Sequence, residues 1–402
     1  MILKKIILWI LTSISILFSC LHAQELDLKT DLMNYILGKD SLIDAVLSQP
    51  ERYHFQFIYT QVHGNEEHPQ LLTADFSTNS YFYPASIVKL PVALVLLEKL
   101  AADSIPTNAF LSVRNDQNCG HTKYSKITQS QNISFQEMIN HLMIVSNNDY
   151  YNAFYHYITP KVLNDTLINR GIYSTKIYKS FTGCEFPENL YCNPTQVRFP
   201  NNKKVINQSS SRLEEAEMMS RYYYDSTKLF GLKHEWEQKI IEGPYDFNYN
   251  IEYPLKDIHS TLTRLIFPTS YLSNERWKIR GQDRLNLIKA MSSCPSFLKG
   301  KFSKDKKHYP DNLYKYIVLG DNNPNYNNIL TYSKIGISHG FVTETAYVHD
   351  ISHNIRYLLS ANIYVNNNKI VNDGIYEYEE TARPFLAKFG QLLIEYEKSK
   401  KR

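Results

Sequence analysis

Strand-like sequence occurs near both ends of this chain, and a long segment of mainly helical character separates the two blocks. His54 to Val62 and Gln70 to Phe76 have the β-branched and aromatic content of strands, with a turn at Gly64-Asn65 between them. Strands from opposite ends of a chain share a sheet only when the ends come together, so this order constrains the fold more than any other feature. Strand patterns recur only beyond residue 329, at Tyr332 to Ile337, Thr343 to Val348 and Ile355 to Val365.

Amphipathic helices flank the two blocks. The spacing of apolar residues predicts one helix over Asp31 to Leu47 and another over Glu377 to Lys398. The stretch from Tyr83 to Gly300 is mainly helical with loops, and Asn189 to Ser211 is polar and loop-like. We therefore predict an α/β (α+β) fold with a discontinuous antiparallel sheet, flanked by the terminal helices, and an inserted all-helical subdomain. The sheet parts are expected at about 31–80 and 329–402, and the helical subdomain at about 81–328.

The composition is that of an ordinary globular protein. The 402 residues include 44 Lys+Arg and 40 Asp+Glu, which gives a formal net charge of +4. With 43% hydrophobic and 21% charged residues, the chain is not collagen-like, disordered or a multi-pass membrane protein. No long basic run supports nucleic-acid binding, and the basic C-terminal residues indicate a solvated tail: Lys398, Lys400, Lys401 and Arg402.

The first residues have the pattern of a secretory signal. Lys4 and Lys5 precede an apolar run of 14 residues from Ile6 to Ser19, which is too short to span a bilayer comfortably. Two endings remain open: Cys20 follows a lipobox-like sequence and becomes a lipidated N-terminus after a signal at 1–19, or Ala23 ends an ordinary signal at 1–23. In either case we expect residues 24–402 to act as one catalytic domain outside the cytoplasm, in the periplasm or anchored by lipid to the bacterial envelope.

Five cysteines allow disulfide bonds in such a compartment. Besides Cys20 they are Cys119, Cys184, Cys192 and Cys294. Cys184 and Cys192 are closest in sequence and are the first candidates for a bridge, while four buried thiols are the alternative. No Cys-x-x-Cys or His-rich spacing indicates a metal site, and no cofactor is expected.

A Ser-x-x-Lys pattern begins the long apolar helix predicted over Tyr83 to Leu100. Ser86 lies at the start of this helix, and Lys89 lies three residues on, on the same face. A hydroxyl is a weak nucleophile until a base takes its proton, and an amine whose pKa is lowered by burial can be that base. The helix N-terminus also directs N–H groups toward a developing oxyanion. The same pattern occurs in a Lys-rich stretch at Ser296 and Ser303, and for any single match the alternative is a capping serine with an exposed lysine.

A second hydroxyl, that of Ser146, follows Ser86 by 60 residues. Ser134 and Glu137 form a capping box that opens a helix ending near Ser146, and another helix follows. At that position Ser146 can pass a proton to a leaving group, and Asn148 can hydrogen-bond a substrate amide. The alternative is a polar helix end that caps its own backbone.

The third element is the strand predicted at Tyr332 to Ile337. Lys334 on this strand can hold a substrate carboxylate, and Gly336 allows a substrate backbone to approach closely. The N–H of Ile337 can act as a second oxyanion donor. The alternative is an edge strand with an exposed lysine. Histidines near this element are interpreted as surface residues: His339, His349 and His353.

In this order, the three elements resemble the marks of class A β-lactamases and penicillin-binding serine hydrolases, which are Ser-x-x-Lys, Ser-x-Asn and Lys-Thr/Ser-Gly. Pro84 to Val92 is very similar to that family's nucleophile helix, and Met143 to Asp149 to its second element. The interval of 60 residues suits class A. The family's fold, a discontinuous sheet with an all-helical subdomain and the site between them, matches the predicted order. The resemblance covers most of the mature chain, most strongly Tyr53 to Ile158 and Tyr332 to Val365.

The resemblance implies two sets of site residues and requires no metal or cofactor. Ser86 attacks a lactam or amide carbonyl, Lys89 is the base or proton shuttle, and Ser146 relays the proton. The expected sets are catalytic Ser86, Lys89 and Ser146, and substrate-binding Asn148, Lys334, Gly336 and Ile337.

Three departures limit what the resemblance implies. Ile335 stands where the family has a hydroxyl residue, which removes one substrate hydrogen bond. Ser146 and Lys334 are 188 residues apart, roughly eighty more than a compact class A enzyme needs, which predicts an insertion in the helical region. The deacylating carboxylate is not identified: Glu185 or Glu188 lies at a suitable distance, and for each the alternative is a surface carboxylate.

Three functions follow. The leading hypothesis is a secreted serine hydrolase that opens the amide bond of a small-molecule β-lactam through a Ser86 acyl-enzyme. A peptidase or esterase acting on cell-wall peptide keeps the same site, and Ile335 and the insertion favour it somewhat. A non-catalytic envelope binding protein that retains the fold is the third.

Overall fold

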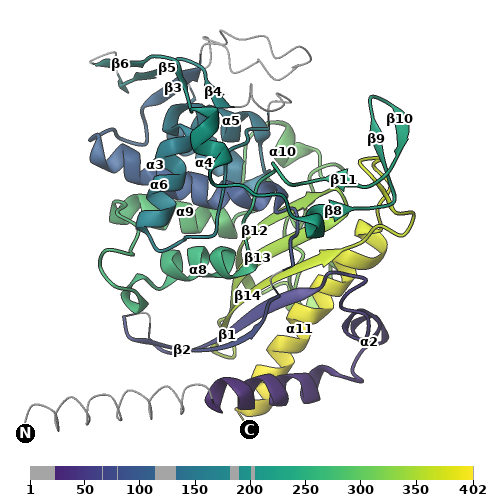
Figure 1. The fold of residues 1–402 in the computed structure, drawn as a ribbon. Helices are drawn as coiled ribbons and strands as arrows, with labels where there is room; N and C mark the ends of the chain where they lie inside the picture. The colour runs from purple at the N-terminus through teal and green to yellow at the C-terminus, as the bar shows by residue number, and fades with distance from the viewer. Residues whose placement is uncertain are drawn as a thin grey trace, which may run out of the picture.

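A five-stranded antiparallel sheet joins the two ends of the chain in the computed structural model, which describes residues 23–65, 67–78, 80–113, 133–181, 190–200 and 204–401. The strand order is β12-β13-β14-β1-β2 (Figure 1). β1 pairs with β14, so the predicted meeting of the two blocks in one sheet is confirmed. Cys20 and the rest of the predicted signal up to residue 22 lie outside the described residues. The strands are β1 (Gln56–Gly64), β2 (Pro69–Phe76), β12 (Leu330–Ser338), β13 (Phe341–Asp350) and β14 (Ile355–Tyr364).

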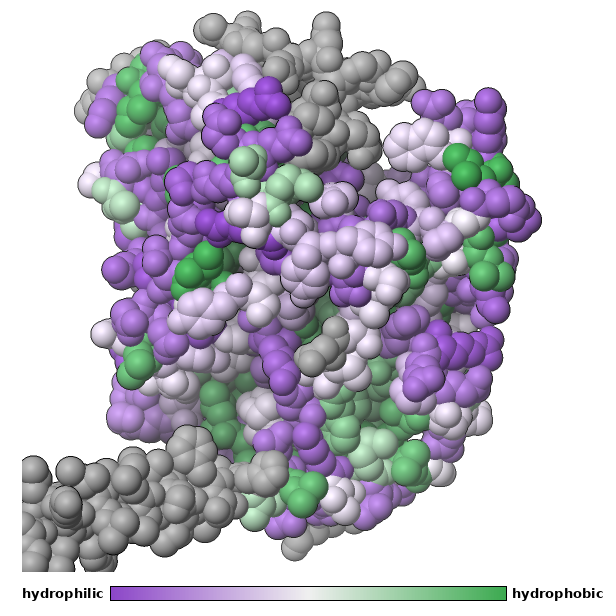
Figure 2. Space-filling view, in the orientation of Figure 1, coloured by the Kyte–Doolittle hydropathy of each residue, from purple (hydrophilic) through white to green (hydrophobic). Residues whose placement is uncertain are grey.

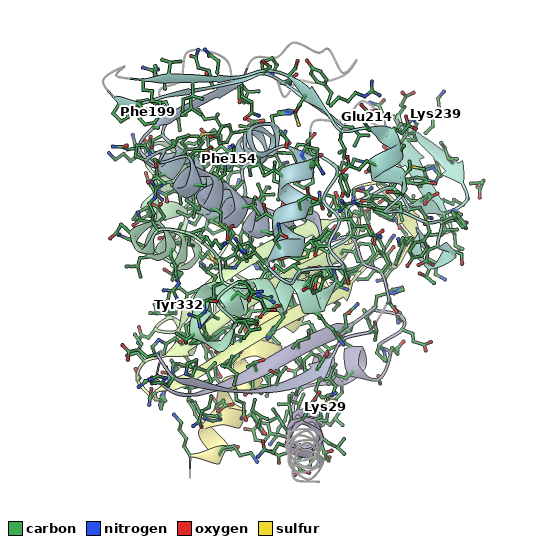
Figure 3. All side chains as sticks on the ribbon, turned by 60° about the vertical axis from the view of Figure 1, so that its left-hand side comes forward. Lys29, Phe154, Phe199, Glu214, Lys239 and Tyr332 are labelled. Carbon is green, nitrogen blue, oxygen red and sulfur yellow. The ribbon has the colours of Figure 1, made fainter. Side chains whose placement is uncertain are left out.

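Alternation along β1 gives the sheet two apolar faces. Phe57 and Tyr59 belong to the core beneath the C-terminal helix α11 (Arg383–Lys400), whereas Ile58 belongs to the core beneath the inserted helices. β1 lies between β14 and β2, so both of its edges are paired. Its side chains are buried on both faces from Gln56 to Val62. The sheet is therefore a middle layer, and Figure 3 shows side chains filling the space on both sides of it, with Phe154 among the helices.

The N-terminal helix is divided in two. Residues 23–36 are helical, and α2 (Ser41–Leu47) follows, so the prediction of one helix over Asp31 to Leu47 was wrong. Gly38 has φ +77°, a left-handed conformation that glycine adopts without strain and that ends a helix. Asp40 then caps α2, because its side chain accepts hydrogen bonds from the N–H groups of Leu42 and Ile43.

Helices form most of the regular structure of the inserted segment, but the prediction of an all-helical subdomain was wrong, because short strands lie between the helices. In its longest described helix, α3 (Lys89–Ala102), all residues from Lys89 to Leu97 are buried, so this helix lies at the centre of the layer. The other helices are α4 (Phe135–Ile144), α5 (Asn148–Ile158), α6 (Pro160–Asn169), α7 (Glu215–Met219), α8 (Leu255–Ile266), α9 (Gly281–Ser292) and α10 (Lys301–Lys304), with 3-10 turns at Ala85–Val88 (η1), Ser226–Lys228, Pro268–Ser270, Pro295–Phe297 and Pro324–Tyr326 and a π turn at Tyr378–Ala382.

Short strands interrupt the insert, which the sequence did not predict. Several of them lie in the stretch at Asn189 to Ser211 that was expected to be a loop, because residues such as Thr195 and Val197 alternate inward with exposed polar neighbours. The pairs are β3-β5-β6, β4-β7, β11-β8 and β10-β9-β15. Their bounds are β3 (Phe110–Val113), β4 (Tyr191–Cys192), β5 (Thr195–Arg198), β6 (Val205–Gln208), β7 (Ser211–Arg212), β8 (Leu229–Phe230), β9 (Lys233–Trp236), β10 (Lys239–Glu242), β11 (Tyr245–Asp246) and β15 (Ile370–Val371).

Exposed apolar side chains are scattered over the surface. Figure 2 shows separate small hydrophobic areas on a mainly hydrophilic face. None of the described helices is long and apolar enough to cross a bilayer. Of the cysteines, Cys192 is a buried free thiol and Cys294 is free and half-buried, whereas Cys119 and Cys184 lie outside the described residues.

A buried histidine ties the helical layer to the sheet. On α8, His259 Nε2 lies 2.9 Å from Thr60 Oγ1, and His259 Nδ1 lies 2.9 Å from Ser360 Oγ. Thr60 in turn contacts Thr73, and Ser360 contacts Thr345, at 2.8 and 2.7 Å. Burial lowers the pKa of His259 to about 4, so the ring is neutral at pH 7 and both nitrogens serve in the network.

This histidine should make the fold sensitive to acid. The unfolded chain takes up a proton at His259 near pH 6.5 and the folded chain only near pH 4, so the free energy of unfolding should fall as the pH falls, by about 3 kcal/mol over that interval. Urea unfolding of His259→Gln should lack this contribution. His63→Gln, at an exposed position of β1, should keep the wild-type pH dependence. An unchanged slope in His259→Gln contradicts the assignment.

Candidate active site

The nucleophile candidate lies on a 3-10 turn that leads into the central helix. Ser86 belongs to η1, and α3 begins at Lys89. The Ile87 N–H donates to Pro84 O at 3.2 Å, which closes the turn. Ser86 remains partly exposed, whereas Lys89 is fully buried. The buried apolar side chains of α3 therefore fix the amine relative to the hydroxyl.

Ser146 lies in the short connection between α4 and α5. The predicted capping box at Ser134 and Glu137 is present and starts α4, and Ser146 follows the end of that helix with φ +53°. Asn147 caps α5 by accepting the Tyr150 N–H at 3.0 Å. The cap and the left-handed residue turn the chain sharply, which presents Ser146 and Asn148 on the same side.

Lys334 lies on β12, which is an edge strand of the sheet. A two-residue turn connects Ser338 of β12 to Phe341 of β13, so these two residues form a hydrogen-bonded pair. Along an antiparallel ladder, hydrogen-bonded pairs alternate with pairs that are not hydrogen-bonded. Ile335 and Ile337 therefore direct their N–H and C=O groups toward the free edge. Lys334 is only 1% exposed, which excludes an exposed lysine on an edge strand.

Gly336 brings β12 into contact with the nucleophile turn. A Cβ atom at this position would lie 2.2 Å from Pro84 O and 2.9 Å from Ser86 N. Only a residue without a side chain permits this approach. The N–H groups of Ser86 and Ile337 consequently flank the same edge of β12.

The amine of Lys89 joins the three elements. Its Nζ lies 2.8 Å from Ser86 Oγ, 3.0 Å from Ser146 Oγ, 2.6 Å from Ser146 O and 2.6 Å from Asn148 Oδ1. The Lys334 Nζ donates to the same Ser146 Oγ at 3.1 Å and to Ile335 O at 2.7 Å. Five of the residues named from the sequence for this site therefore lie together: Ser86, Lys89, Ser146, Asn148 and Lys334.

Burial of the two amines sets their charge. Desolvation and the charge of Lys334 hold the pKa of Lys89 well below its usual range. Burial lowers the pKa of Lys334 to about 7; the Glu344 carboxylate opposes this change and the Lys315 amine adds to it. Burial therefore favours the neutral form of Lys89, while Lys334, with a pKa of about 7, is partly protonated at pH 7.

Sequence reasoning missed an aromatic residue over the amine. The centre of the Phe181 ring lies 5.4 Å from Lys89 Nζ and 4.5 Å from the centre of the Tyr151 ring. The backbone N–H of Phe181 donates to Asn152 Oδ1 at 2.7 Å. No motif marks this position. Glu185 and Glu188 lie outside the described residues, and within the described part of the chain no carboxylate hydrogen-bonds to Ser86 or Lys89.

Two other positions differ from their sequence interpretation. The Ile335 side chain is 1% exposed and packs in the core beneath α11, on the face of β12 opposite to Lys334. His339 was expected at the surface, but it packs against Tyr83 with ring centres 5.2 Å apart. Burial lowers the pKa of His339 to about 4. The turn at the end of β12 carries this ring into an aromatic cluster, which strand alternation alone does not predict.

The other two Ser-x-x-Lys matches form no such site. Ser296 is exposed and contacts Asp311 and Lys306 rather than the lysine three residues on. The Ser303 hydroxyl donates to Gly300 O at 3.1 Å, within its own turn.

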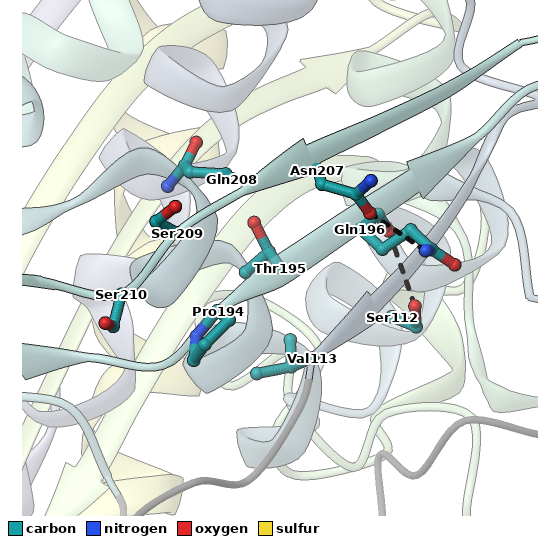
Figure 4. Close-up of a pocket in the computed structure, with 9 residues that line it drawn as sticks. All are labelled: Ser112, Val113, Pro194, Thr195, Gln196, Asn207, Gln208, Ser209 and Ser210. Carbon is teal, nitrogen blue, oxygen red and sulfur yellow. Dashed lines mark hydrogen bonds between the residues drawn. The ribbon is translucent and has the colours of Figure 1, made fainter.

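A cavity of about 660 Å³ lies on the β3-β5-β6 sheet, away from these residues (Figure 4). Its lining side chains are neutral, and Gln196 Nε2 donates to Asn207 Oδ1 across it at 2.9 Å. None of the Ser86 cluster lines this cavity. Within the described part of the chain, no group of His, Cys, Asp and Glu side chains is arranged to hold a metal ion.

Residues 40–223 match the model of the beta-lactamase enzyme family. This stretch carries Ser86, Lys89, Ser146 and Asn148, whereas Lys334 lies beyond it. The match confirms the resemblance noted in the sequence. The stretch that matches begins just before α2 and ends beyond α7, so it includes β1, β2 and the helices α3 to α6.

Solved structures of similar shape are β-lactamases of low sequence identity. One from Sphaerobacter thermophilus DSM 20745 has a TM-score of 0.49 at 10% identity, over 87% of this chain and 95% of its own. One from Xanthomonas campestris pv. campestris str. ATCC 33913 has 0.48 at 12%, over 88% and 98%. A class A representative from Bacteroides cellulosilyticus DSM 14838 has 0.46 at 12%, over 92% and 98%. No curated protein sequence matches the chain.

Gly336→Ala should destabilise the folded protein. The new methyl group meets backbone atoms, which cannot rotate away, so we expect the free energy of unfolding to fall by roughly 1–3 kcal/mol in urea titrations. Gly281→Ala is a matched control, because nothing lies within 4 Å of its Cβ position. Equal stability of Gly336→Ala and the wild type contradicts the close approach.

Proposed function

We propose that the protein is a serine hydrolase of β-lactamase type, in which Ser86 attacks the amide carbonyl of a β-lactam and forms an acyl-enzyme. The observation that carries this proposal is the 2.8 Å contact between Ser86 Oγ and the Nζ of a fully buried Lys89. A buried amine with lowered pKa is a base at neutral pH, and here it lies within hydrogen-bond distance of the hydroxyl.

The partners of Lys89 favour this role. Ser146 O and Asn148 Oδ1 only accept hydrogen bonds, and at 2.6 Å each they take the two hydrogens of the neutral amine. The single lone pair of the neutral amine then remains for Ser86, whose hydroxyl can transfer its proton to Nζ. As Oγ bonds to the carbonyl carbon, this proton moves to Nζ and the carbonyl π electrons move to oxygen.

The oxyanion is held at the edge of β12. The Ser86 and Ile337 N–H groups supply the two donors, and a fixed pair of such donors lowers the barrier without reorganisation. Collapse of the tetrahedral adduct breaks the C–N bond, and the proton on Lys89 passes through Ser146 Oγ to the leaving nitrogen. Lys334, which donates to the same Oγ at 3.1 Å, binds the substrate carboxylate.

Covalent labelling tests the nucleophile. A fluorescent penicillin should label the wild type, and Ser86→Ala should lower the labelling rate at least roughly a thousandfold, because the variant lacks the attacking hydroxyl that lies beside the Lys89 amine. Ser296→Ala removes the serine of another Ser-x-x-Lys match and should label normally. Equal labelling of Ser86→Ala and wild type would reject Ser86 as the nucleophile.

The charge of Lys334 predicts a distinctive pH dependence. Its pKa of about 7 means that the cation is lost as pH rises, so acylation by benzylpenicillin should weaken above neutrality, by up to about tenfold per pH unit. The methyl ester of benzylpenicillin has no carboxylate and should not lose rate in this way. In the ratio of the acylation rates of benzylpenicillin and its methyl ester, the titration of groups that affect both substrates equally cancels. A ratio that stays constant from pH 6 to 9 contradicts the role of Lys334.

A peptidase or esterase acting on cell-wall peptide is the second candidate. It is favoured by Ile335, which stands where the resembled family has a hydroxyl residue and whose side chain packs in the core beneath α11. Nitrocefin separates the two: rapid turnover supports the β-lactamase, and a stable adduct supports the peptidase.

We also propose export of the protein, from the basic and apolar N-terminal sequence. The lipobox-like sequence before Cys20 supports attachment to the envelope by a lipid. Replacing Cys20 by Ser should release an anchored protein into the soluble periplasmic fraction, whereas an unchanged distribution favours cleavage after Ala23.

A further inference from the structure

An arm of the inserted segment packs against the end of β12. β8 and β11 pair through Phe230 and Tyr245, and Phe230 contacts Phe341 on β13 with ring centres 4.9 Å apart. Figure 1 shows this arm beside the ends of the central strands. The arm lies beyond the family match, which ends at residue 223.

Four rings form an aromatic wall at this place: Tyr83, Tyr245, Phe247 and His339. The His339 ring lies 5.2 Å from Tyr83, 5.5 Å from Tyr245 and 5.6 Å from Phe247. Tyr245 and Phe247 are 4.7 Å apart, and Phe247 and Tyr83 5.4 Å. Tyr83 and Phe247 are buried, while Tyr245 and His339 are half-buried and present the accessible surface.

The wall lies next to the reacting groups. Tyr83 precedes Ser86 by three residues, and His339 follows Ile337 by two. Lys179, from the segment that leads to Phe181 over Lys89, is near enough to His339 for its charge to act on the ring. The accessible side of the wall therefore borders the space above Ser86.

The order of residues along β12 fixes which part of a substrate the wall meets. Ser146 and Lys334 serve the leaving group, and Lys334 precedes Ile337 by three residues, or about 10 Å of strand. The oxyanion donor Ile337 lies between Lys334 and His339. Because the carbonyl is held at Ile337 with its leaving group toward Lys334, its acyl substituent extends toward His339.

We propose that the β8–β11 arm selects the acyl group of the substrate, and that the aromatic wall favours an aromatic or bulky apolar acyl side chain over none. This inference rests on the proposed function. Rings held by several neighbours lose little conformational freedom when they contact a ligand. Most of the contact energy therefore favours a substrate whose acyl side chain touches the rings over one without that side chain.

Paired substrates measure this selectivity. Benzylpenicillin and 6-aminopenicillanic acid share the lactam and carboxylate, but only the first has a phenyl-bearing acyl side chain. The ratio of their acylation rate constants should favour benzylpenicillin in the wild type. Tyr245→Ala should lower this ratio about fivefold, the value of one aromatic contact, and Tyr245→Phe should retain it. Tyr224→Ala, at an exposed position of the same insert, is the matched control and should keep the wild-type ratio.

A second variant protects the test against misfolding of the first. His339 has φ +54°, and Asn tolerates that conformation, so His339→Asn removes the ring without straining the turn. It should lower the ratio in the same direction. If both variants are acylated and keep the wild-type ratio, the role of the arm is overturned while the proposed function stands. Absence of Ser86 acylation in the wild type by either compound overturns the proposed function and, with it, this inference.

Discussion

The buried amine of Lys89 is the contact on which the arrangement of the site depends. Taking an ammonium out of water is costly, so burial favours the neutral amine and requires that its hydrogens find acceptors. Those acceptors come from the α4–α5 connection, and the hydroxyl that the amine can deprotonate comes from η1. The helical core around α3 and the sheet behind β12 must therefore both be in place before the hydroxyl can be activated.

A second buried charge cluster supports the edge strand. Glu344 lies opposite Ile335 on β13 and accepts the N–H groups of Tyr316 and Ile317 at 3.0 and 2.8 Å. Burial raises the pKa of Glu344 to about 7, and the nearby Lys315 is buried with its pKa lowered to about 8. Glu344 favours the charged form of Lys334, so the residues behind β12 influence how strongly the site attracts an anion.

Much of the site was predictable because its chemistry is local in sequence. Ser86 with Lys89, and Ser146 with Asn148, are close neighbours in sequence, and each pair stands where a helix begins. The two strand blocks could share a sheet only by joining the chain ends. Other features depend on contacts distant in sequence. Phe181 reaches Lys89 through tertiary packing, and the strands of the insert are too short for a periodic pattern. Gly38 is a residue that commonly ends a helix, but the apolar residues on both sides of it keep helical spacing, so the sequence predicted one continuous helix.

The most direct test of the account is the intact mass of the protein followed over time after benzylpenicillin is added. The account predicts a shift equal to one added benzylpenicillin in the wild type, absent in Ser86→Ala, because ring opening leaves all atoms of the lactam on Ser86. The rate at which the adduct is lost then reports deacylation. A wild-type protein that neither gains the adduct nor hydrolyses benzylpenicillin, or a Ser86→Ala protein that gains the adduct equally, would contradict the central claim that Ser86 is the acylated nucleophile.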